Sequence, residues 1–339
     1  MRIERTHESA MRLRRKCCAL FLLVSLCAVA ASATAMINRA GGWRAVRHGL
    51  AGKDLNAVYF VDSKRGWIAG DDGFVSRTEN GGETWARQKV ATADAINDVY
   101  FRNRDEGFLL AGNAIFGTRN GGAEWRENSR FSAQAFDGAQ PELYSIRFGS
   151  KKKGWVVGSA SRREKVTDSV VLYTNDGGAS WVRQSVPVRA ELIHIDFAND
   201  ERGWIVGAGG TILHTVDGGE TWTQQRSNTT ATLYHVDFRN NRIGWAVGER
   251  GAILRTTDGG DTWFPVTIPV RATLLSVQFT SDDDGWIVGR GGTILRTGDA
   301  GRTWIRQEST TTQNLYALYA DKKKNWAVGG DGLVLQYER

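Results

Sequence analysis

Two neighbouring segments of the chain place histidine and aspartate at matching positions. Both segments read Leu-x-His-x-Asp-Phe, and their polar residues are His194, Asp196, His235 and Asp237. Two imidazole nitrogens and two carboxylates form a plausible ligand set for zinc or manganese. The same pattern also arises when one unit of sequence is duplicated, and spacing alone does not tell which way the side chains face. We therefore predict no metal cofactor and keep these four residues as the alternative metal candidates.

The two aspartates also give the best case for an enzyme. A glycosidase needs two carboxylates at a set separation, and Asp196 and Asp237 would lie close together if their segments were neighbouring strands. The sequence contains no P-loop, no dinucleotide-binding glycine pattern and no His-Glu-x-x-His motif. Chemistry that depends on those motifs is therefore not expected.

Both segments belong to a repeat that runs through most of the chain. A phrase close to Gly-Trp-x-Val-Gly is followed by one close to Asp-Gly-Gly-x-Thr-Trp, most clearly at 244–263 and 285–304. The first phrase recurs at steps of 41, 47, 49, 41, 41 and 40 residues. It begins at Gly66, Gly107, Gly154, Gly203, Gly244 and Gly285, with Asn325 in the seventh slot. A fixed period of this size is typical of repeat architectures.

Each unit holds four short segments that read as strands. The first alternates branched or aromatic residues with polar ones, as at 192–197, and the second is the Gly-Trp phrase. A glycine-rich turn leads to a third strand, and the Asp-Gly-Gly phrase forms a hairpin before the fourth, because glycine adopts positive φ without a steric penalty. Four antiparallel strands in about 40 residues make a propeller blade. The sequence therefore predicts an all-β propeller of four-stranded antiparallel blades.

The two ends of the chain predict how the ring closes. The seventh unit stops after its third strand, at 333–336, without an Asp-Gly-Gly turn. The segment beginning Gly41-Gly42-Trp43 reads as the end of such a turn plus a fourth strand, and it precedes the first unit. We therefore predict seven blades, with the N-terminal strand completing the last one. The thirteen tryptophans fit this count, because seven follow the turn and six occupy the Gly-Trp slot, where Phe108 replaces the seventh.

The first 35 residues differ from the repeats. A basic segment at 12–16, an apolar run at 17–31 and small residues at 31–35 read as a signal peptide, and the run is too short for a transmembrane helix. All three cysteines lie here, so the mature chain would hold no disulfide. The predicted organisation is a signal peptide at 1–35 and a single propeller domain at 36–339. We expect export across the inner membrane to the periplasm.

The net charge argues against nucleic acid as a partner. The whole chain carries a formal charge of +7, and removing the leader's six basic and two acidic residues leaves +3. Nucleic-acid binding needs a concentrated basic face, which this balance does not predict. We expect a monomer that is at most peripheral to a membrane.

The first strands should line the centre of the ring. Their third and fifth positions are Ala57/Tyr59, Asp98/Tyr100, Ser145/Arg147, His194/Asp196, His235/Asp237, Ser276/Gln278 and Ala317/Tyr319. A site similar to that of a sialidase would contain three arginines that bind a carboxylate, a Tyr–Glu pair as the nucleophile and an acidic residue as the general acid. Arg147 is the only arginine in these positions, so the arginine triad cannot be assembled from them. We predict that the protein is not an enzyme, with a sialidase-like glycoside hydrolase as the alternative.

The Asp-Gly-Gly phrase resembles the Asp-box, or BNR repeat, of sialidases and of propellers that are not enzymes. Its central residues are Asn80, Asn120, Asp176, Asp217, Asp258 and Asp299. The Asp-box is a folding element whose carboxylate caps backbone amides in a tight hairpin, and asparagine can do most of this.

The whole repeated phrase is more specific. Leu-x-x-Val-x-Phe, Gly-Trp-x-Val-Gly and Gly-x-Ile-Leu-Arg-Thr-x-Asp-Gly-Gly-x-Thr-Trp together resemble the photosystem II stability/assembly factor family from Trp43 to Arg339. The resemblance implies a lumenal propeller without a cofactor that binds newly made reaction-centre subunits. In a host without photosynthesis it implies another membrane protein client, such as a transporter.

The family's role is associated with a patch of arginines on one face. The corresponding connections here hold Arg162, Arg163, Arg189, Arg226, Arg250, Arg271 and Arg290. We expect Arg250 and Arg290 in equivalent turns of adjacent blades, where guanidinium groups would bind carboxylates of a partner. Two unusually long connections, 128–142 and 159–169, are expected as loops on the same face, which would then be the binding face.

Overall fold

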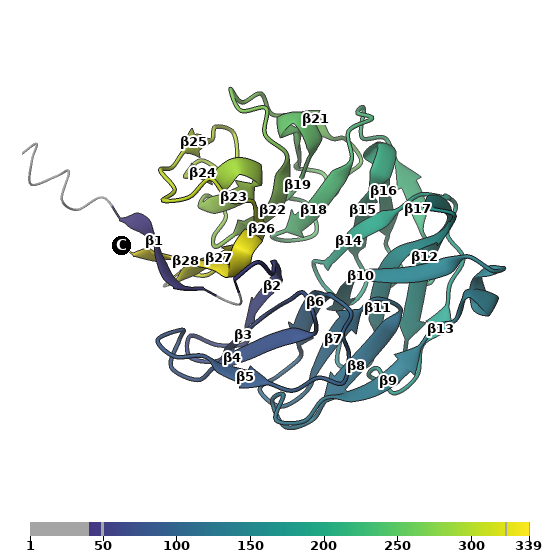
Figure 1. Cartoon of the computed structure of the whole chain (residues 1–339). Coiled ribbons are helices and arrows are strands. Elements are labelled where there is room, and N and C mark those ends of the chain that lie inside the picture. Colours follow the sequence, from purple (N-terminus) through teal and green to yellow (C-terminus); the bar gives the residue numbers. More distant parts are fainter. Residues whose placement is uncertain (1–40, 49–50, 323, 339) are drawn as a thin grey trace, which may run out of the picture. The chain divides into compact units, whose positions relative to one another are not determined.

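The computed structural model describes residues 41–48, 51–322 and 324–338, so the predicted signal peptide lies outside the described residues. The compact unit Trp43–Tyr337 is a ring of seven four-stranded sheets (Figure 1). Every strand pair within a blade for which a register is given is antiparallel, as in β2–β3 and β3–β4. The predicted fold class and blade count are therefore confirmed. Among the described residues no helix is long and apolar enough to span a membrane.

The strands occupy the same four places in each blade. The innermost strands are β2 (Leu55–Phe60), β6 (Ile96–Phe101), β10 (Gln140–Phe148), β14 (Leu192–Phe197), β18 (Leu233–Phe238), β22 (Leu274–Phe279) and β26 (Leu315–Ala320). The second strands are β3 (Gly66–Gly70), β7 (Gly107–Ala111), β11 (Gly154–Arg162), β15 (Gly203–Gly207), β19 (Gly244–Gly248), β23 (Gly285–Gly289) and β27 (Asn325–Gly329).

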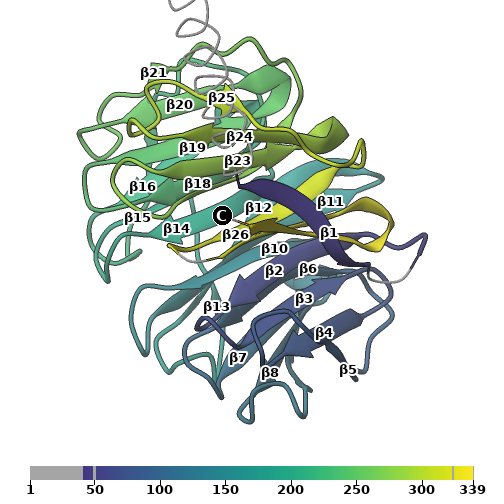
Figure 2. The ribbon, with the colours of Figure 1, turned by 90° about the vertical axis from the view of Figure 1, so that its left-hand side faces the viewer.

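The outer half of each blade is built in the same way, and β1 lies at the outer edge of its blade (Figure 2). The third strands are β4 (Phe74–Thr78), β8 (Ala114–Thr118), β12 (Lys165–Thr174), β16 (Ile212–Thr215), β20 (Ile253–Thr256), β24 (Thr293–Thr297) and β28 (Leu333–Glu338). The fourth strands are β5 (Ala86–Gln88), β9 (Arg126–Arg130), β13 (Val182–Arg183), β17 (Thr223–Gln225), β21 (Phe264–Pro265), β25 (Ile305–Arg306) and β1 (Gly42–His48).

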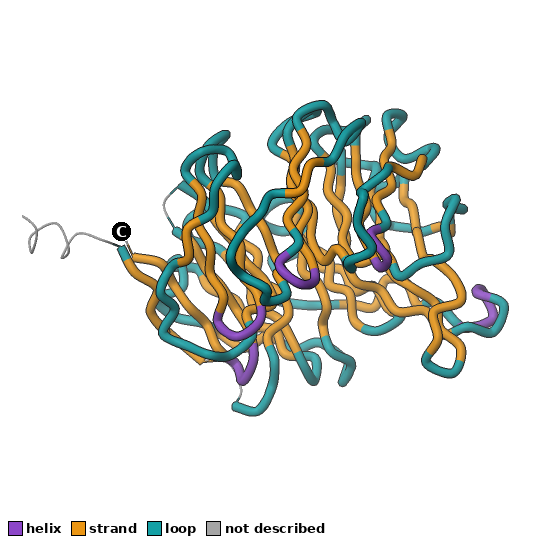
Figure 3. The backbone as a smooth tube through the Cα atoms, turned by 90° about the horizontal axis from the view of Figure 1, so that it is seen from above, coloured by secondary structure: helices purple, strands orange, loops and turns teal. Residues whose placement is uncertain are grey.

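Five short 3₁₀ turns complete the described structure. They are η1 (Ala133–Phe136), η2 (Ala208–Gly210), η3 (Glu249–Gly251), η4 (Arg290–Gly292) and η5 (Gly330–Gly332). The last four join second to third strands, so they lie at the same end of their blades as the entries to the innermost strands (Figure 3). We call this end of the ring the η face and the opposite end, which carries the Asp-box turns, the Asp-box face.

The ring closes through the N-terminal strand, as predicted. The last sheet has the order β1-β28-β27-β26, so β1 supplies its outer strand. Trp43 is 4% exposed and belongs to the same core cluster as Leu335. Its indole ring lies 5.5 Å from that of Trp286 and 5.6 Å from the Tyr337 ring, measured between centroids. The N-terminal segment therefore contributes buried aromatic packing to the final blade as well as a strand.

Aromatic rings hold neighbouring blades together. At the interface between the fourth and fifth blades, Phe238 stacks on Trp204 at 3.4 Å, and Trp263 meets the same phenyl ring edge-on at 5.8 Å. The indole N–H of Trp204 donates a hydrogen bond to the Gly259 carbonyl at 3.0 Å. Burial and packing of this kind give the tryptophans a structural role.

In the second blade, Phe108 replaces the tryptophan of the Gly-Trp phrase. Its ring keeps the aromatic packing, but the indole N–H is lost. Phe108 stacks on Phe148 at 5.2 Å. The Gly178 carbonyl of the next blade accepts a hydrogen bond from Asn128 Nδ2 at 2.9 Å. The amide of the fourth strand thus provides the polar contact at this blade interface.

The Asp-box turns are closed by side-chain hydrogen bonds. In the fifth blade, Asp258 Oδ1 accepts bonds from Thr256 Oγ1 at 2.7 Å and from the Thr262 N–H at 3.0 Å. In the first blade, Asn80 Oδ1 accepts the Thr84 N–H at 2.9 Å. Asparagine therefore caps the same backbone amide as aspartate does, which explains why both residues serve in this turn.

The sequence predicts the segments 128–142 and 159–169 as long loops, but much of both is regular structure of the second and third blades. Segment 159–169 is a β-hairpin, because β11 and β12 stay paired as far as Arg162↔Lys165. Arg163 and Glu164 form its two-residue turn with φ values of 49° and 64°, as tight hairpin turns require. Segment 128–142 contains the end of β9, η1 and the start of β10. The physical reason is backbone pairing: β10 extends to Gln140 and supplies partners for the lengthened β11.

Candidate functional site

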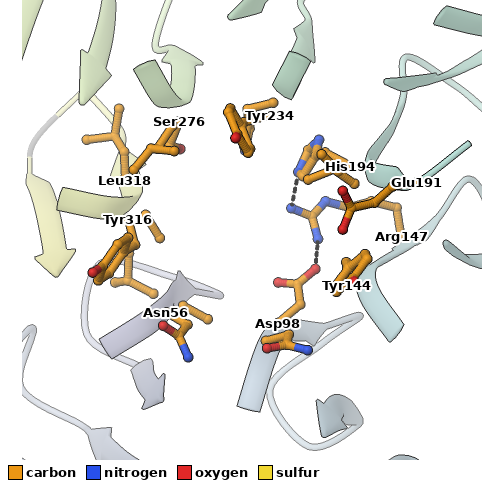
Figure 4. A pocket seen from close by; sticks show the side chains of 17 residues that line it. Asn56, Asp98, Tyr144, Arg147, Glu191, His194, Tyr234, Ser276, Tyr316 and Leu318 are labelled. Atoms are coloured by element: carbon orange, nitrogen blue, oxygen red, sulfur yellow. Dashed lines mark hydrogen bonds and ion pairs between the residues drawn. The ribbon is translucent and has the colours of Figure 1, made fainter. Parts of the chain in front are cut away.

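A cavity of about 470 Å³ lies at the centre of the ring. It is lined from the innermost strands, and Figure 4 shows their side chains converging on it from all sides. The third-position residues of six blades line it, as predicted, but Arg147 is the only fifth-position residue among the described lining. The second-position residues line it as well, although sequence reasoning did not include them. They are Asn56, Asn97, Tyr144, Ile193, Tyr234, Leu275 and Tyr316.

A β-bulge explains the extra ring of side chains. In β18 the pairing steps from Leu233 to His235, so Tyr234 has no partner in β19. The same shift occurs at this place in every innermost strand, for example between Leu55 and Ala57 in β2. An unpaired residue bends the strand and re-aims its side chain, so the alternation of faces fails here. A bulge leaves no clear signal in the sequence, which is why these lining residues were missed.

Arg147 forms the polar centre of the cavity. Its Nη1 donates to Asp98 Oδ2 at 2.8 Å, and its Nη2 lies 3.1 Å from His194 Nε2 (Figure 4). Asp98 Oδ2 also accepts the Ile146 N–H at 3.0 Å. The guanidinium charge is therefore matched by a carboxylate inside the protein. No second arginine lines the cavity among the described residues, so the arginine triad of a sialidase is not formed there.

The two candidate histidines stack on each other. Their ring centroids are 3.6 Å apart, with an angle of 25° between the planes. Burial lowers the pKa of His235 to about 3, and burial with the nearby His235 and Arg147 lowers the pKa of His194 well below its usual value. Both rings are therefore neutral near pH 7.

The histidines and aspartates do not assemble as a metal centre. The Val236 N–H approaches His194 Nδ1 at 3.4 Å, so N–H donors face both ring nitrogens of His194. Across residues 41–48, 51–322 and 324–338, no group of three or more His, Cys, Asp or Glu side chains is placed to hold a metal ion.

Asp196 and Asp237 face the neighbouring blade instead of the cavity. Asp196 Oδ2 accepts the Phe238 N–H at 2.8 Å, and Asp237 Oδ2 accepts the Phe279 N–H at 2.9 Å. Gln278 Oε1 continues the pattern by accepting the Ala320 N–H at 2.7 Å. Neither aspartate lines the cavity, so the carboxylate pair of the glycosidase alternative is not offered to a substrate there. These three fifth-position side chains connect the fourth blade to the fifth, the fifth to the sixth and the sixth to the seventh.

Burial raises the pKa of both aspartates, and the backbone N–H bonds that they accept only partly offset this effect. Burial, with the neighbouring Asp196 carboxylate as a second cause, raises the pKa of Asp237 to about 8. Burial also raises the pKa of Asp196, although the Phe238 N–H and Arg147 oppose the shift. Because a protonated carboxyl group still accepts a hydrogen bond through its carbonyl oxygen, the bond from the Phe279 N–H can form with Asp237 neutral.

This shift predicts a pH dependence of stability. The folded protein keeps a proton on Asp237 that the unfolded chain releases above the ordinary pKa of 3.8. The contribution of this proton to the free energy of unfolding is complete below a pH of 3.8 and is lost as the pH rises through about 8. We expect the free energy of unfolding in urea to fall between pH 5 and 8, by at most about 1.4 kcal/mol per pH unit for this group.

An Asp237→Asn variant should keep the hydrogen bond and flatten that fall. The matched control is Asp258→Asn in an Asp-box turn, which should leave the slope between pH 5 and 8 as in the wild type. An unchanged slope in Asp237→Asn would contradict the assignment of the proton to this residue.

The seven predicted arginines lie on the η face. Arg250 is in η3 and Arg290 in η4, so they do occupy the same turn of adjacent blades, one residue apart in register. Arg189, Arg226 and Arg271 are in connections that lead into the innermost strands, which open on the same face. All seven side chains are exposed, and none forms an ion pair within the part of the chain that the structure describes.

The arginines cover only part of that face. They belong to the third to sixth blades and the connections between them, while Arg162 and Arg163 lie at the tip of the third-blade hairpin. The turns of the seventh and first blades carry aspartates in the corresponding places, Asp331 in η5 and Asp71 and Asp72 before β4. The η face is therefore basic on one side and acidic on the other. The acidic side was readable from the sequence but was not recognised.

The sequence matches the family model of the photosynthesis system II assembly factor YCF48 over residues 86–185, 138–228, 180–270, 221–308 and 271–338. These overlapping matches together cover about three quarters of the chain. The chain belongs to this family. No curated protein matches the sequence.

Solved structures share the fold. A structure of YCF48 bound to D1 peptide matches with a TM-score of 0.71 and 18% identity, covering 88% of this chain and 97% of that one. YCF48 from Cyanidioschyzon merolae matches with a TM-score of 0.70 and 19% identity, covering 88% and 99%. Virginiamycin B lyase from Staphylococcus aureus matches with a TM-score of 0.72 and 15% identity, covering 88% of this chain and 100% of that one. An assembly factor and an enzyme thus share this propeller, so the fold alone does not decide between them.

Proposed function

We propose that the protein is a non-catalytic, protein-binding propeller that acts outside the cytoplasm and assists the assembly of a membrane protein complex. Family membership supports this role, because the family is described as an assembly factor. A structural relative in that family has been captured with a peptide of another protein, D1. A rigid ring with exposed turns on one face suits such binding.

The set of seven exposed arginines without ion pairs carries the proposal. Elsewhere in the same ring, Arg147 and Arg183 are matched by carboxylates of the chain itself. Arginines left unmatched on one face are available to carboxylates of a partner, which they can bind in bidentate fashion. Such charges also speed the encounter of two proteins.

The backbone at Arg250 supports a binding role for this residue. Its φ of 56° lies in the left-handed region, where the corresponding residues of the neighbouring blades are Gly209 and Gly291. A non-glycine residue in this conformation costs about 1 kcal/mol or more. Arginine at this position therefore works against stability, as residues kept for binding often do.

The hydrolase alternative has little support from the cavity. Its candidate aspartates bind backbone amides of neighbouring blades, and the one arginine of the described lining is bound by Asp98. A site built on three free arginines or on that pair of carboxylates is therefore not available.

The place of action and the client are inferred from the family and the leader. The segment at 1–35 reads as a signal peptide, so we propose a location in the periplasm, or in the thylakoid lumen of a phototroph. In a phototroph the client would be a reaction-centre subunit, and in another host a different membrane protein such as a transporter. We propose that the protein acts as a monomer.

The test is capture from solubilised host membranes with the mature protein, residues 36–339, as bait. The proposal expects subunits of one membrane complex, enriched in wild-type eluates over a bait whose arginines are reversed in charge. Recovery of soluble proteins alone, or equal recovery by both baits, would contradict it.

A further inference from the structure

The central cavity has a mouth of tyrosines, each beside a carboxylate. Tyr144, Tyr234 and Tyr316 line the cavity (Figure 4). They occupy the second positions of alternate blades, where the innermost strands begin at the η face. The Tyr316 hydroxyl donates to Asp54 Oδ2 at 2.8 Å, and the Tyr144 hydroxyl lies 3.4 Å from Glu142 Oε2.

Carboxylates also lie near the third tyrosine, Tyr234: Glu249 Oε2 accepts the Thr232 N–H at 3.1 Å, and Glu191 lines the same cavity. Burial and the neighbouring carboxylates of Glu249 and Glu191 raise the pKa of Tyr234, while the nearby Arg290 opposes the shift. Three phenol rings and several carboxylates thus surround one opening.

The described residues that line the cavity carry a net negative charge. Among the lining residues, Asp98 is matched by Arg147 at 2.8 Å, and both histidines are neutral near pH 7. Glu191 also lines the cavity and has no ion pair among the described residues. One carboxylate charge therefore remains. This carboxylate would repel a bound anion, and no unpaired cationic side chain among the described lining residues would attract one.

We propose that the cavity binds a cationic nitrogen group, an ammonium or a guanidinium. Aromatic rings attract such a group through their π faces, and a carboxylate beside them adds charge and hydrogen bonds. The group would come from a lysine or arginine side chain of a client, or from a free small amine.

The surrounding charges extend this inference to the form of a client segment. The carboxylates of Asp54, Glu142, Glu191 and Glu249 lie around the mouth, and the exposed arginines occupy turns and connections of the same η face, with Arg290 near Tyr234. Their complement is a basic residue with acidic residues a few positions away on one or both sides. This extension rests on the function proposed above, whereas binding of the cationic group does not.

The first measurement uses small probes with the whole mature protein. Tyrosines are labelled with 3-fluorotyrosine, and the fluorine signals of the three mouth residues are assigned from single Tyr→Phe variants. N-acetyl-lysine methylamide should shift these signals in a saturable way. N-acetyl-norleucine methylamide, which lacks the ammonium, should bind at least tenfold more weakly. Equal binding of the two, or preferential binding of N-acetyl-glutamate methylamide, would overturn the proposal.

Substitutions then separate the cavity from general surface charge. Glu191→Gln should weaken binding of the lysine probe about tenfold, and Tyr234→Leu should weaken it several-fold. Glu201→Gln is the matched control, because Glu201 is exposed in the turn between β14 and β15 on the opposite face. Glu201→Gln should leave the affinity unchanged. Should Glu191→Gln bind as the wild type does, the proposal fails. Near-ultraviolet circular dichroism of each variant verifies that the propeller is folded.

The source of the cationic group is decided by two further probes. A peptide that carries one lysine between glutamates, bound at least tenfold more tightly than n-butylammonium, assigns the group to a client segment. Equal affinities assign the cavity to a free amine, and both outcomes support the cationic group. The added affinity of the peptide should disappear in Arg250→Gln/Arg290→Gln while the lysine probe still binds. Failure of client capture with intact lysine binding would count against the proposed function alone.

Discussion

Reversing the charge of two arginines, Arg250→Glu with Arg290→Glu, is expected to lower capture of the client at least about tenfold. The two residues occupy the same turn of adjacent blades, and both side chains are exposed without an ion pair among the described residues. The variant would present carboxylates where the client's carboxylates bind, so repulsion replaces attraction. Client recovered from solubilised membranes by wild-type and variant bait is the quantity to compare.

The stability of this variant should hardly change, because exposed charges contribute little to folding. Arg242→Glu/Arg302→Glu is the control with the same change of net charge, since both residues are exposed on the Asp-box face. It should capture the client as the wild type does. Equal losses in the two double variants would show that net charge is responsible and would contradict a specific arginine surface.

Arg250→Gly provides an independent variant at the same turn. Because the residue has a φ of 56°, glycine relieves backbone strain there, although it also gives the unfolded chain more freedom. We expect unfolding in urea to be unchanged or shifted up by as much as about 1 kcal/mol, together with weaker capture. This combination separates a binding residue from one that supports the fold.

Replacing the tryptophan that closes the ring, Trp43→Ala, is expected to lower the free energy of unfolding by about 3–5 kcal/mol. Trp43 is 4% exposed and packs against Trp286 and Tyr337. Its strand completes the last blade, so its loss weakens the ring at the point where the ends of the chain meet. Urea unfolding gives the loss, and hydrogen exchange shows which strands open.

The matched control is Trp304→Ala, the same residue type 7% exposed in a blade whose strands are continuous in sequence. Both variants should lose a similar free energy. Fast exchange in Trp43→Ala should appear in β26, β27 and β28, and in Trp304→Ala in β22–β25. The closure mechanism is wrong if Trp43→Ala leaves the exchange of β28 unchanged.

Much of the fold follows from the repeated phrase alone. The period predicts the blades, and the missing fourth strand at the C-terminus together with Trp43 predicts the closure. Both features are local: a turn of glycines and a tryptophan after it need no tertiary information. The sequence predicts a loop where the third-blade hairpin lies, because the pairing of this hairpin depends on an equally lengthened β10 that the sequence does not mark.

The site was less predictable than the fold. The alternation of a strand predicts that third and fifth positions share a face, and the bulge at Tyr234 breaks this rule by adding second positions to the cavity. The prediction that Asp196 and Asp237 face the central channel is wrong for another reason. The N–H groups of the next blade lie within reach of their carboxylates, and that contact depends on how two blades pack.

The arginines show the opposite case. Their place on one face follows from the order of strands, since turns that join second to third strands all lie at the same end of the blades. The sequence could therefore place Arg250 and Arg290 together without knowledge of side-chain contacts. That these arginines form no ion pairs among the described residues could be seen only in the structure, because ion pairs depend on distances between blades.

The most direct test of an arginine-bearing binding face is a cross-link map in the native host. A photo-reactive benzoylphenylalanine is placed at Thr230, exposed in the connection after Arg226, and separately at Thr257, exposed on the Asp-box face. We predict that Thr230 probes cross-link to a subunit of a membrane complex and that Arg250→Glu/Arg290→Glu abolishes the adduct. Adducts formed from Thr257 and not from Thr230 would contradict it.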